Sequence, residues 1–212
     1  MLKQILTMAV IGLGALALNG CETISEEQCL AGDWIGRGYQ DGQAGRSASR
    51  LNDYVEACAE HGVTPDPAAY EEGRREGLRQ YCVPAVGYRV GRDGGNYNNV
   101  CSGAAEADFL VGFQDGRVVY DAQQLAETAR SEVSATSARL TELDDKVDYF
   151  QARARDTTLS EEEREAAGDR ANELRRERRD LERDWRRAQE ALDEAERDAR
   201  DALQYFRSRY GD

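Results

Sequence analysis

Histidine is almost absent from the sequence, since His61 is the only one in 212 residues. Many zinc sites and acid–base catalytic centres depend on histidine, so its scarcity argues against these classes of enzyme. The chain also lacks any run of 18 apolar residues, and we expect no internal membrane-spanning helix. Acidic residues outnumber basic ones by 41 to 28, and the resulting formal net charge of −13 makes nucleic acid and anionic membrane surfaces poor partners.

The beginning of the sequence has the pattern of a secretory leader. Lys3 precedes an apolar stretch that has the length of a signal-peptide core and is too short to span a bilayer. The following tetrapeptide, Leu-Asn-Gly-Cys, ends at Cys21 and resembles a bacterial lipobox, in which the cysteine is lipidated. We therefore expect cleavage of residues 1–20 and lipid attachment at Cys21. The alternative is an ordinary secretory signal followed by a chance cysteine.

Four further cysteines follow the leader, and an even number behind an export signal predicts two disulfides in an oxidising compartment. Three pairings are possible, and we prefer Cys29 with Cys58 and Cys82 with Cys101, because neighbouring cysteines close the shortest loops. A zinc site would need closely spaced ligand pairs, whereas these cysteines are 29, 24 and 19 residues apart. We expect no metal site and no cofactor.

Glycine, proline and cysteine divide the chain near residue 121. Residues 21–120 contain fifteen glycines, all three prolines and all five cysteines, whereas residues 121–212 contain two glycines and neither proline nor cysteine. Backbone flexibility therefore differs between the two regions. We predict a cleaved leader over 1–20, a Gly/Cys-rich domain over 21–120 and a helical hairpin over 121–212.

The Gly/Cys-rich domain contains four degenerate units, each with one cysteine, one aromatic residue and two glycines four positions apart. Glycines at this spacing share one face of a helix and let another backbone come close, which favours short, closely packed helices. Turn-rich structure is the alternative, because three of the units contain an Asp-Gly step. The glycine pairs are Gly38 and Gly42, Gly73 and Gly77, Gly91 and Gly95, and Gly112 and Gly116.

A longer ordered pattern runs through the same region. It begins with WIGRGYQDGQAG at residues 34–45, continues with CAEHG at residues 58–62 and GLRQYC at residues 77–82, and ends with Phe109 and two following glycines. In this order, these segments resemble an uncharacterised family of proteobacterial lipoproteins, domain of unknown function 2799. The resemblance covers about residues 21–120. It implies an envelope lipoprotein and carries no assigned chemical activity.

Apolar residues recur at spacings of three and four after residue 121, which predicts coiled-coil helices over about 121–154 and 160–208. Ser160 and Glu163 have the spacing of a capping box that starts a new helix. A short loop between two amphipathic helices predicts an antiparallel pair, with a single long helix as the alternative. The expected fold class is mostly α: a small Gly-rich, disulfide-stapled helical domain followed by a long antiparallel coiled-coil hairpin.

The position of the loop also predicts which residues of the two helices face each other. Pairing about the loop places Leu140 near Leu174 and Val133 near Leu181. The second helix is longer than the first, so its end is expected to reach the Gly-rich domain. Phe206 is then expected to dock near Phe109.

Two classes of function fit this organisation. The preferred one is a lipid-anchored cell-envelope protein of structural or interaction type, whose coiled-coil arm contacts or spaces an envelope protein partner. The alternative is a periplasmic module that binds a glycan or a cationic ligand through the Gly-rich domain. Exposure of its aromatic residues would favour binding, and their burial would favour a scaffold. The candidate binding residues are Trp34, Tyr39, Tyr88 and Tyr97.

No catalytic motif occurs in the sequence, and we expect no catalytic residues and no enzyme. Acidic residues recur in the repeats and raise the possibility of paired carboxylates, although turn capping and solvation explain them more simply. Glu22 directly after Cys21 favours the outer membrane, facing the periplasm, by resemblance to the lipoprotein sorting rule of enteric bacteria. The expected partners are thus the membrane, through the lipid, and an envelope protein, but not nucleic acid. The recurring acids are Asp41, Glu76, Asp93 and Asp115.

Overall fold

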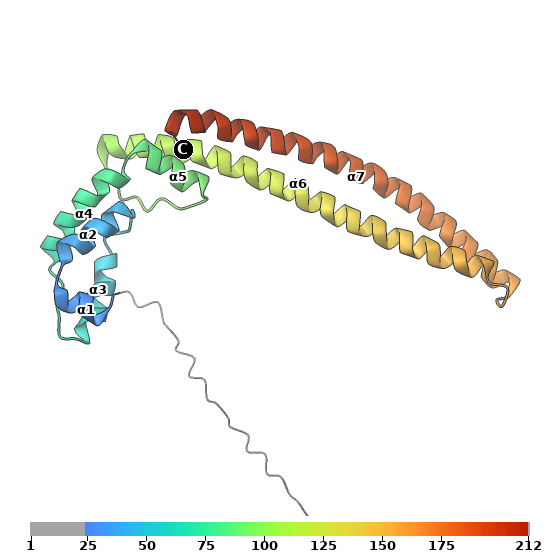
Figure 1. The fold of residues 1–212 in the computed structure, drawn as a ribbon, viewed down its shortest axis with the longest axis horizontal. Helices are drawn as coiled ribbons and strands as arrows, with labels where there is room; N and C mark the ends of the chain where they lie inside the picture. The colour runs from blue at the N-terminus through green and yellow to red at the C-terminus, as the bar shows by residue number, and fades with distance from the viewer. Residues whose placement is uncertain (1–23, 212) are drawn as a thin grey trace, which may run out of the picture.

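The computed structural model describes residues 24–211, which form seven α-helices and no strand (Figure 1). The expected mostly-α fold is therefore confirmed. The predicted leader and Cys21 lie outside the described residues. In the described range, no helix is long and apolar enough to cross a membrane. The helices are α1 (Glu26–Ala31), α2 (Trp34–Gln43), α3 (Arg50–Ala59), α4 (Pro67–Tyr81), α5 (Pro84–Arg92), α6 (Gly103–Arg155) and α7 (Glu161–Tyr210).

Local sequence sets several of the helix starts. Ser25 forms a capping box with Gln28 at the start of α1, so both side chains satisfy free backbone N–H groups. Asp33 accepts a hydrogen bond from the backbone N–H of Gly36 at the start of α2. Asp66 caps α4, and the proline that follows occupies a position where no backbone donor is needed.

Helices α2 and α4 pack together through glycines on both sides. A Cβ atom added to Gly38 or Gly42 would lie less than 3.0 Å from backbone atoms of α4. The same holds in reverse for Gly73 and Gly77 against the backbone of α2. Only glycine permits this approach, so the prediction of close helix packing is confirmed for these two pairs.

Helices α5 and α6 repeat this packing, with one correction to the predicted glycine pairs. The glycines of α5 that face α6 are Gly87 and Gly91, and they oppose Gly112 and Gly116. Gly95 was wrongly assigned to this pair, because α5 ends at Arg92 and the chain then turns through a left-handed glycine at position 94.

The two helix pairs are copies of one arrangement. The carbonyl of Ile35 faces Gly73 as the carbonyl of Pro84 faces Gly112. The carbonyl of Tyr39 faces Gly77, and the carbonyl of its counterpart Tyr88 faces Gly116. The four sequence units therefore fold as two tandem modules. We call α1 to α4 the first module, and residues 82–120, which contain α5 and the start of α6, the second module.

Each module contains one disulfide, with the preferred pairing. Cys29 of α1 is bonded to Cys58 of α3, and Cys82, at the end of α4, is bonded to Cys101, just before α6. Both bridges join Cα atoms 5.6 Å apart, within the usual range for disulfides. Each bridge thus connects segments that precede the two glycine-paired helices of its own module.

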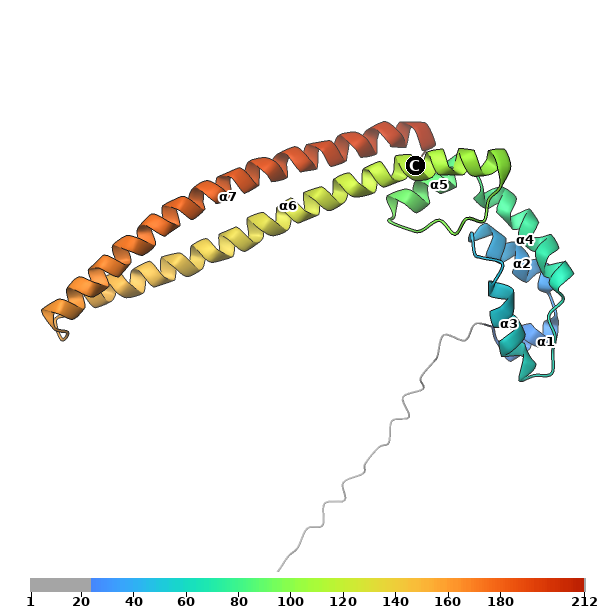
Figure 2. The same ribbon diagram turned by 180° about the vertical axis from the view of Figure 1, so that it is seen from behind.

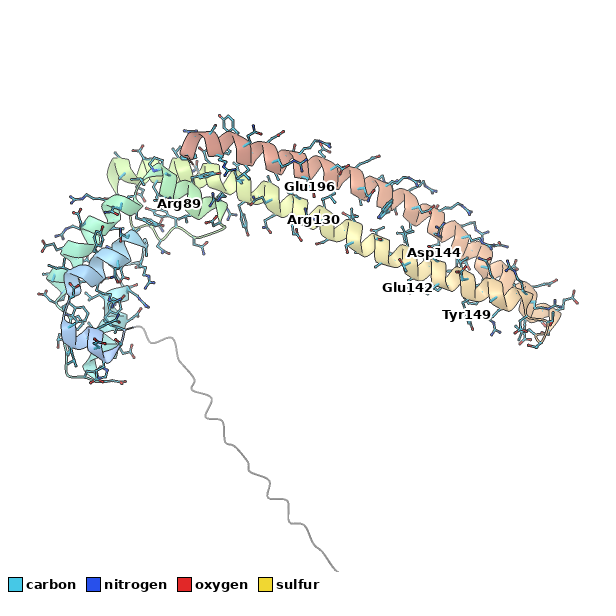
Figure 3. The ribbon with its side chains drawn as sticks, viewed as in Figure 1. Arg89, Arg130, Glu142, Asp144, Tyr149 and Glu196 are labelled. Carbon is cyan, nitrogen blue, oxygen red and sulfur yellow. A yellow bond between two sulfur atoms is a disulfide. The ribbon has the colours of Figure 1, made fainter. Side chains whose placement is uncertain are left out.

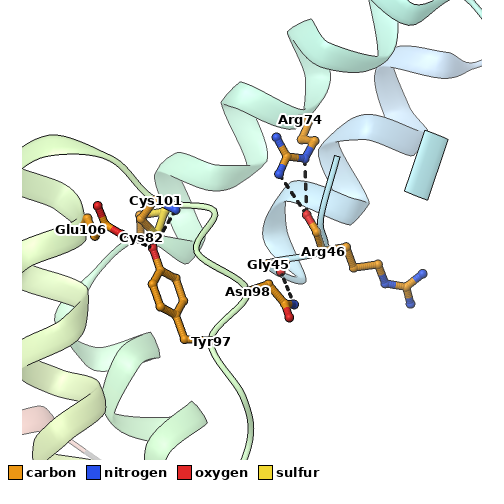
Figure 4. The surroundings of a disulfide bond; sticks show 8 residues. All are labelled: Gly45, Arg46, Arg74, Cys82, Tyr97, Asn98, Cys101 and Glu106. Atoms are coloured by element: carbon orange, nitrogen blue, oxygen red, sulfur yellow. Dashed lines mark hydrogen bonds between the residues drawn. A yellow bond between two sulfur atoms is a disulfide. The ribbon is translucent and has the colours of Figure 1, made fainter. Parts of the chain in front are cut away.

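The two modules meet around Tyr81 and the loop before α6. The Tyr81 ring stacks on Phe109 at a centroid distance of 5.0 Å and covers the left-handed Gly45, where a side chain would collide with the ring. Asn98 donates a hydrogen bond of 2.9 Å to the carbonyl of Gly45 (Figure 4). In the same loop, the Tyr97 hydroxyl accepts a hydrogen bond from the backbone of the disulfide residue Cys101. These contacts bind the modules to each other.

Helix α6 continues from the second module into a long antiparallel pair with α7 (Figures 1 and 2). It starts at Gly103, eighteen residues before the expected start near 121, and passes that point without a break. Ser160 and Glu163 form the predicted capping box, which excludes the single-helix alternative. We call residues 121–155 of α6 together with α7 the arm. Whether 21–120 and 121–212 fold as separate domains stays a prediction.

The register of the arm differs from the predicted one by about one heptad. Asp144 forms an ion pair with Arg178, whereas the predicted pairing would have placed it eight residues earlier on α7. Arg130 pairs with Glu196 at 2.7 Å across the two helices (Figure 3). The prediction failed because a heptad pattern looks the same after a shift of seven residues, so only the loop geometry fixes the register.

The outer part of the arm has its own apolar core. Leu143 and Val147 of α6 pack against Leu174 and Leu181 of α7, and all four are at most 8% exposed. Leu140 and Phe150 border this cluster. Large apolar residues here point into the seam between the helices, as expected for a coiled coil.

Candidate functional site

The four aromatic residues proposed to bind a ligand do not gather on one exposed surface. Trp34 is buried beside Tyr54, and Tyr88 is fully buried beneath the end of α7. Tyr39 and Tyr97 are partly buried and lie in different modules, with Tyr97 packed against Phe109. Trp34 and Tyr88 are therefore core residues, whereas Tyr39 and Tyr97 are neither buried nor part of an exposed cluster, so the burial of all four that a scaffold predicts is met only in part.

The recurring acids do not converge either. Asp93 forms an ion pair with the neighbouring Arg92, and Glu76 forms one with Arg79 of the same helix. Asp41 lies in the first module, whereas Asp115 lies on α6 beneath the end of α7. The described residues contain no group of three or more histidine, cysteine, aspartate or glutamate side chains placed to hold a metal ion.

Asp41 is the centre of a buried polar cluster. It is 3% exposed, and its Oδ2 accepts hydrogen bonds from the hydroxyls of Tyr54 at 2.8 Å and Tyr70 at 2.9 Å. Arg46 pairs with the second carboxylate oxygen at 3.5 Å, and Arg74 donates to the carbonyl of Arg46. Burial, and then the hydrogen bond to Asp41, raises the pKa of both tyrosines. The phenols therefore stay protonated donors, and the cluster holds α2, α3 and α4 together.

A second polar cluster fixes the C-terminal end of α7 at the second module. Tyr210 stacks on Tyr88 of α5 with ring centroids 4.6 Å apart, and Phe206 lies beside the same ring. The Tyr210 hydroxyl donates a hydrogen bond of 2.6 Å to Asp115, which also pairs with Arg209 at 3.1 Å. We call these side chains the base clamp. They join α5, α6 and α7.

The base clamp corrects the expected docking position of Phe206. The end of α7 does dock on the Gly-rich region, as predicted, but it packs against Tyr88 rather than near Phe109. The one-heptad difference in register moves the end of α7 further along α6. Burial, and then the hydrogen bond to Asp115, raises the pKa of Tyr210 to about 12, which keeps its donor proton in place at neutral pH.

A groove of about 600 Å³ lies between α6 and α7 beside the base clamp. Its walls are mostly apolar, and its rim carries three acids and no basic residue. The sequence analysis missed this groove because it followed only the seam positions of the coiled coil. The available signal was a second heptad series in α6, formed by Val111, Val118 and Leu125. The groove is lined by Val118, Asp121, Ala122, Leu125, Ala129, Ala191, Glu194, Ala195 and Asp198.

Comparison with known proteins identifies a family for the first part of the chain. Residues 33–118 match the family described as "Protein of unknown function (DUF2799)". No curated protein and no solved structure matches the chain. The matched segment begins at the cap of α2 and ends within α6, so it contains both glycine-paired helix pairs and excludes the arm. Residues 33–118 are thus similar to the DUF2799 family, and in this chain the matched segment folds as the glycine-paired helices α2 with α4 and α5 with the start of α6.

Proposed function

We propose that this protein is a lipid-anchored component of the cell envelope, without enzymatic activity, whose arm contacts or spaces an envelope protein partner. The observation that carries the proposal is the way the arm is attached. Helix α6 belongs to both the second module and the arm, and the base clamp fixes the end of α7 to the same module. A helix pair that is held at one end in this way projects in a fixed direction. This suits an arm that acts as a spacer or presents a binding surface to a partner.

The proposed anchor is Cys21, and the location is the periplasmic face of the outer membrane. Ile24, three residues later, is 6% exposed in the core of the first module. The lipid would therefore hold the module close to the bilayer instead of at the end of a long tether. Helices α1 and α3 lie at the end of the first module remote from α5 and α6 (Figure 2). The arm then starts from the part of the domain farthest from the anchor.

The anchor is tested by replacing Cys21 with serine and following metabolic fatty-acid label and membrane fractionation. We expect the variant to lose the label and leave the membrane fraction. A variant that keeps both would contradict the anchor.

The arm is tested by photo-crosslinking in intact cells. A photoreactive residue is placed at Leu125 near the base of the arm, at Tyr149 near its tip, and at Val55 on the first module. All three side chains are exposed apolar groups, so the positions are chemically matched. We expect discrete protein adducts from an arm position and none from Val55. Adducts from Val55 alone, or from no position, would contradict the proposal.

A further inference from the structure

Exposed apolar side chains concentrate where the arm joins the second module. Nine large apolar residues of the described chain are at least 36% exposed, and five of them lie in this region. A contiguous exposed apolar surface on a soluble part of a protein commonly marks an interaction site. The five residues are Val83, Val111, Val118, Leu125 and Tyr205.

Three of these residues form a straight stripe along α6. Val111, Val118 and Leu125 are spaced by seven and are 46%, 52% and 67% exposed. Ala191 and Ala195 of α7 form the opposite wall of the groove of about 600 Å³. Fourteen residues of helix correspond to about 21 Å, so the stripe has the length of two heptads of a partner helix.

The seam between α6 and α7 differs between this region and the outer part of the arm. The buried residues here are the small Ala126 and Ala188 together with Val119, whereas Leu143 and Leu174 fill the seam farther out. Because the small alanines occupy the contact between the helices, the larger side chains of the stripe are left outside it. A third helix laid in the groove would cover them and complete a local three-helix bundle.

The charges at the rim indicate what kind of helix fits. Asp121, Glu194 and Asp198 line the groove, and no basic residue does. Asp121 is paired with Arg117 at 3.2 Å, whereas no ion pair of Glu194 or Asp198 is found in the described chain. A second copy would bring the same acids face to face, and an anionic bilayer would meet like charge. A helix with lysine or arginine beside its apolar face is complementary.

We propose that the groove formed by Val118, Leu125 and the alanines of α7 binds an amphipathic helix of a partner protein, with an apolar face flanked by basic residues. This inference rests on the proposed function and specifies the chemistry of the partner. The stripe provides the apolar contact, and Glu194 and Asp198 select the charge of the partner.

The test uses the full chain carrying Cys21→Ser and two synthetic helical peptides of about 18 residues, matched to the length of such a groove. Both peptides have the same leucine and alanine heptads, but one is flanked by lysine and arginine and the other by glutamate. Binding is measured by fluorescence anisotropy. We expect the basic peptide to bind about tenfold tighter or more, with the preference weakening at high salt.

Variants separate the apolar contribution from the charged one. Leu125→Asp should weaken binding of the basic peptide by about tenfold or more. Tyr149→Asp, which places the same charge at an exposed aromatic near the tip, is the matched control and should have no effect. The double variant Glu194→Lys with Asp198→Lys should reverse the preference between the two peptides. Equal binding of both peptides, or binding insensitive to Leu125→Asp, would overturn the inference.

The same protein preparation also tests two other possible occupants of the groove, a second copy of the chain and a lipid membrane. A dimer of the chain, seen by sedimentation and dissolved by Leu125→Asp, would overturn the inference in favour of a second copy. Binding to phosphatidylglycerol vesicles that depends on Leu125 would overturn it in favour of a membrane.

If neither peptide binds but Tyr149 still gives protein adducts in cells, the groove inference fails and the proposed function stands. If the basic peptide binds but no arm position gives adducts, the proposed function fails.

Discussion

Tyr210, the last residue of α7, donates a hydrogen bond to Asp115 of α6 across 95 residues of sequence. Its ring also stacks on Tyr88 of α5. Together with Phe206 beside the same ring and Arg209 paired with Asp115, these contacts join the C-terminal end of α7 to the second module.

Tyr210→Phe should loosen the end of α7 and leave the rest of the arm intact. The substitution keeps the ring stacked on Tyr88 but removes the hydroxyl, which costs about 1 kcal/mol for a partly buried hydrogen bond. Hydrogen exchange should therefore accelerate in the last turns of α7 and not around Leu174. Tyr205→Phe is the control, because the Tyr205 side chain is 66% exposed and no hydrogen bond of its hydroxyl is found in the described chain. Faster exchange along the whole of α7 would contradict a localised base clamp.

Stability should decrease in strongly alkaline solution because of Tyr210. Burial and Asp115 raise its pKa from 10.0 to about 12 in the folded chain. A group with a raised folded pKa stabilises the fold below its unfolded pKa, and this contribution is lost as the pH rises toward the folded value. Unfolding midpoints should therefore fall between about pH 10 and pH 12.

Tyr210→Phe should reduce that fall without abolishing it. Tyr54 and Tyr70 also have raised pKa values, and their hydrogen bonds to Asp41 remain in this variant. Chemical denaturation followed by circular dichroism at several pH values measures the effect. An identical pH profile for both proteins would show that Tyr210 does not contribute.

Gly42→Ala and Gly168→Ala should change stability in opposite directions. The Cβ added at position 42 would collide with the backbone of α4, so the helices must separate at a cost of ~1–3 kcal/mol. At position 168 of α7 the nearest atom is the Cβ of Ala154 at 4.0 Å, an ordinary contact. That substitution should add about 1 kcal/mol through helix propensity. Urea unfolding measures both, and two changes of the same sign would contradict the glycine-paired packing.

Sequence reasoning succeeded where a local signal had one structural meaning. Ser160 and Glu163 mark the start of α7, because a capping box acts within a single turn. The preference for the shortest loops correctly predicted the cysteine pairing, and Cys29 is bonded to Cys58 within the first module.

Sequence reasoning failed where the signal repeated itself. The heptads of the arm allow registers one heptad apart, so the predicted pairing about the loop differs from the register that the ion pair of Asp144 with Arg178 shows. Gly91 has a glycine four residues on both sides, and only the end of α5 shows that Gly87 is its partner. The stripe through Leu125 lies outside the seam, so a search for seam residues does not find it.

The central claim is that the arm projects from the tandem modules in one fixed direction. It is tested by the distribution of distances between spin labels at Ser47 in the first module and Thr157 at the tip of the arm, both exposed, with the native disulfides intact. The claim predicts a single narrow distribution that broadens when Tyr210→Ala removes both the stack on Tyr88 and the hydrogen bond to Asp115. A broad or multiple distribution in the unaltered chain would show that the arm swings freely, and would contradict its role as a fixed spacer.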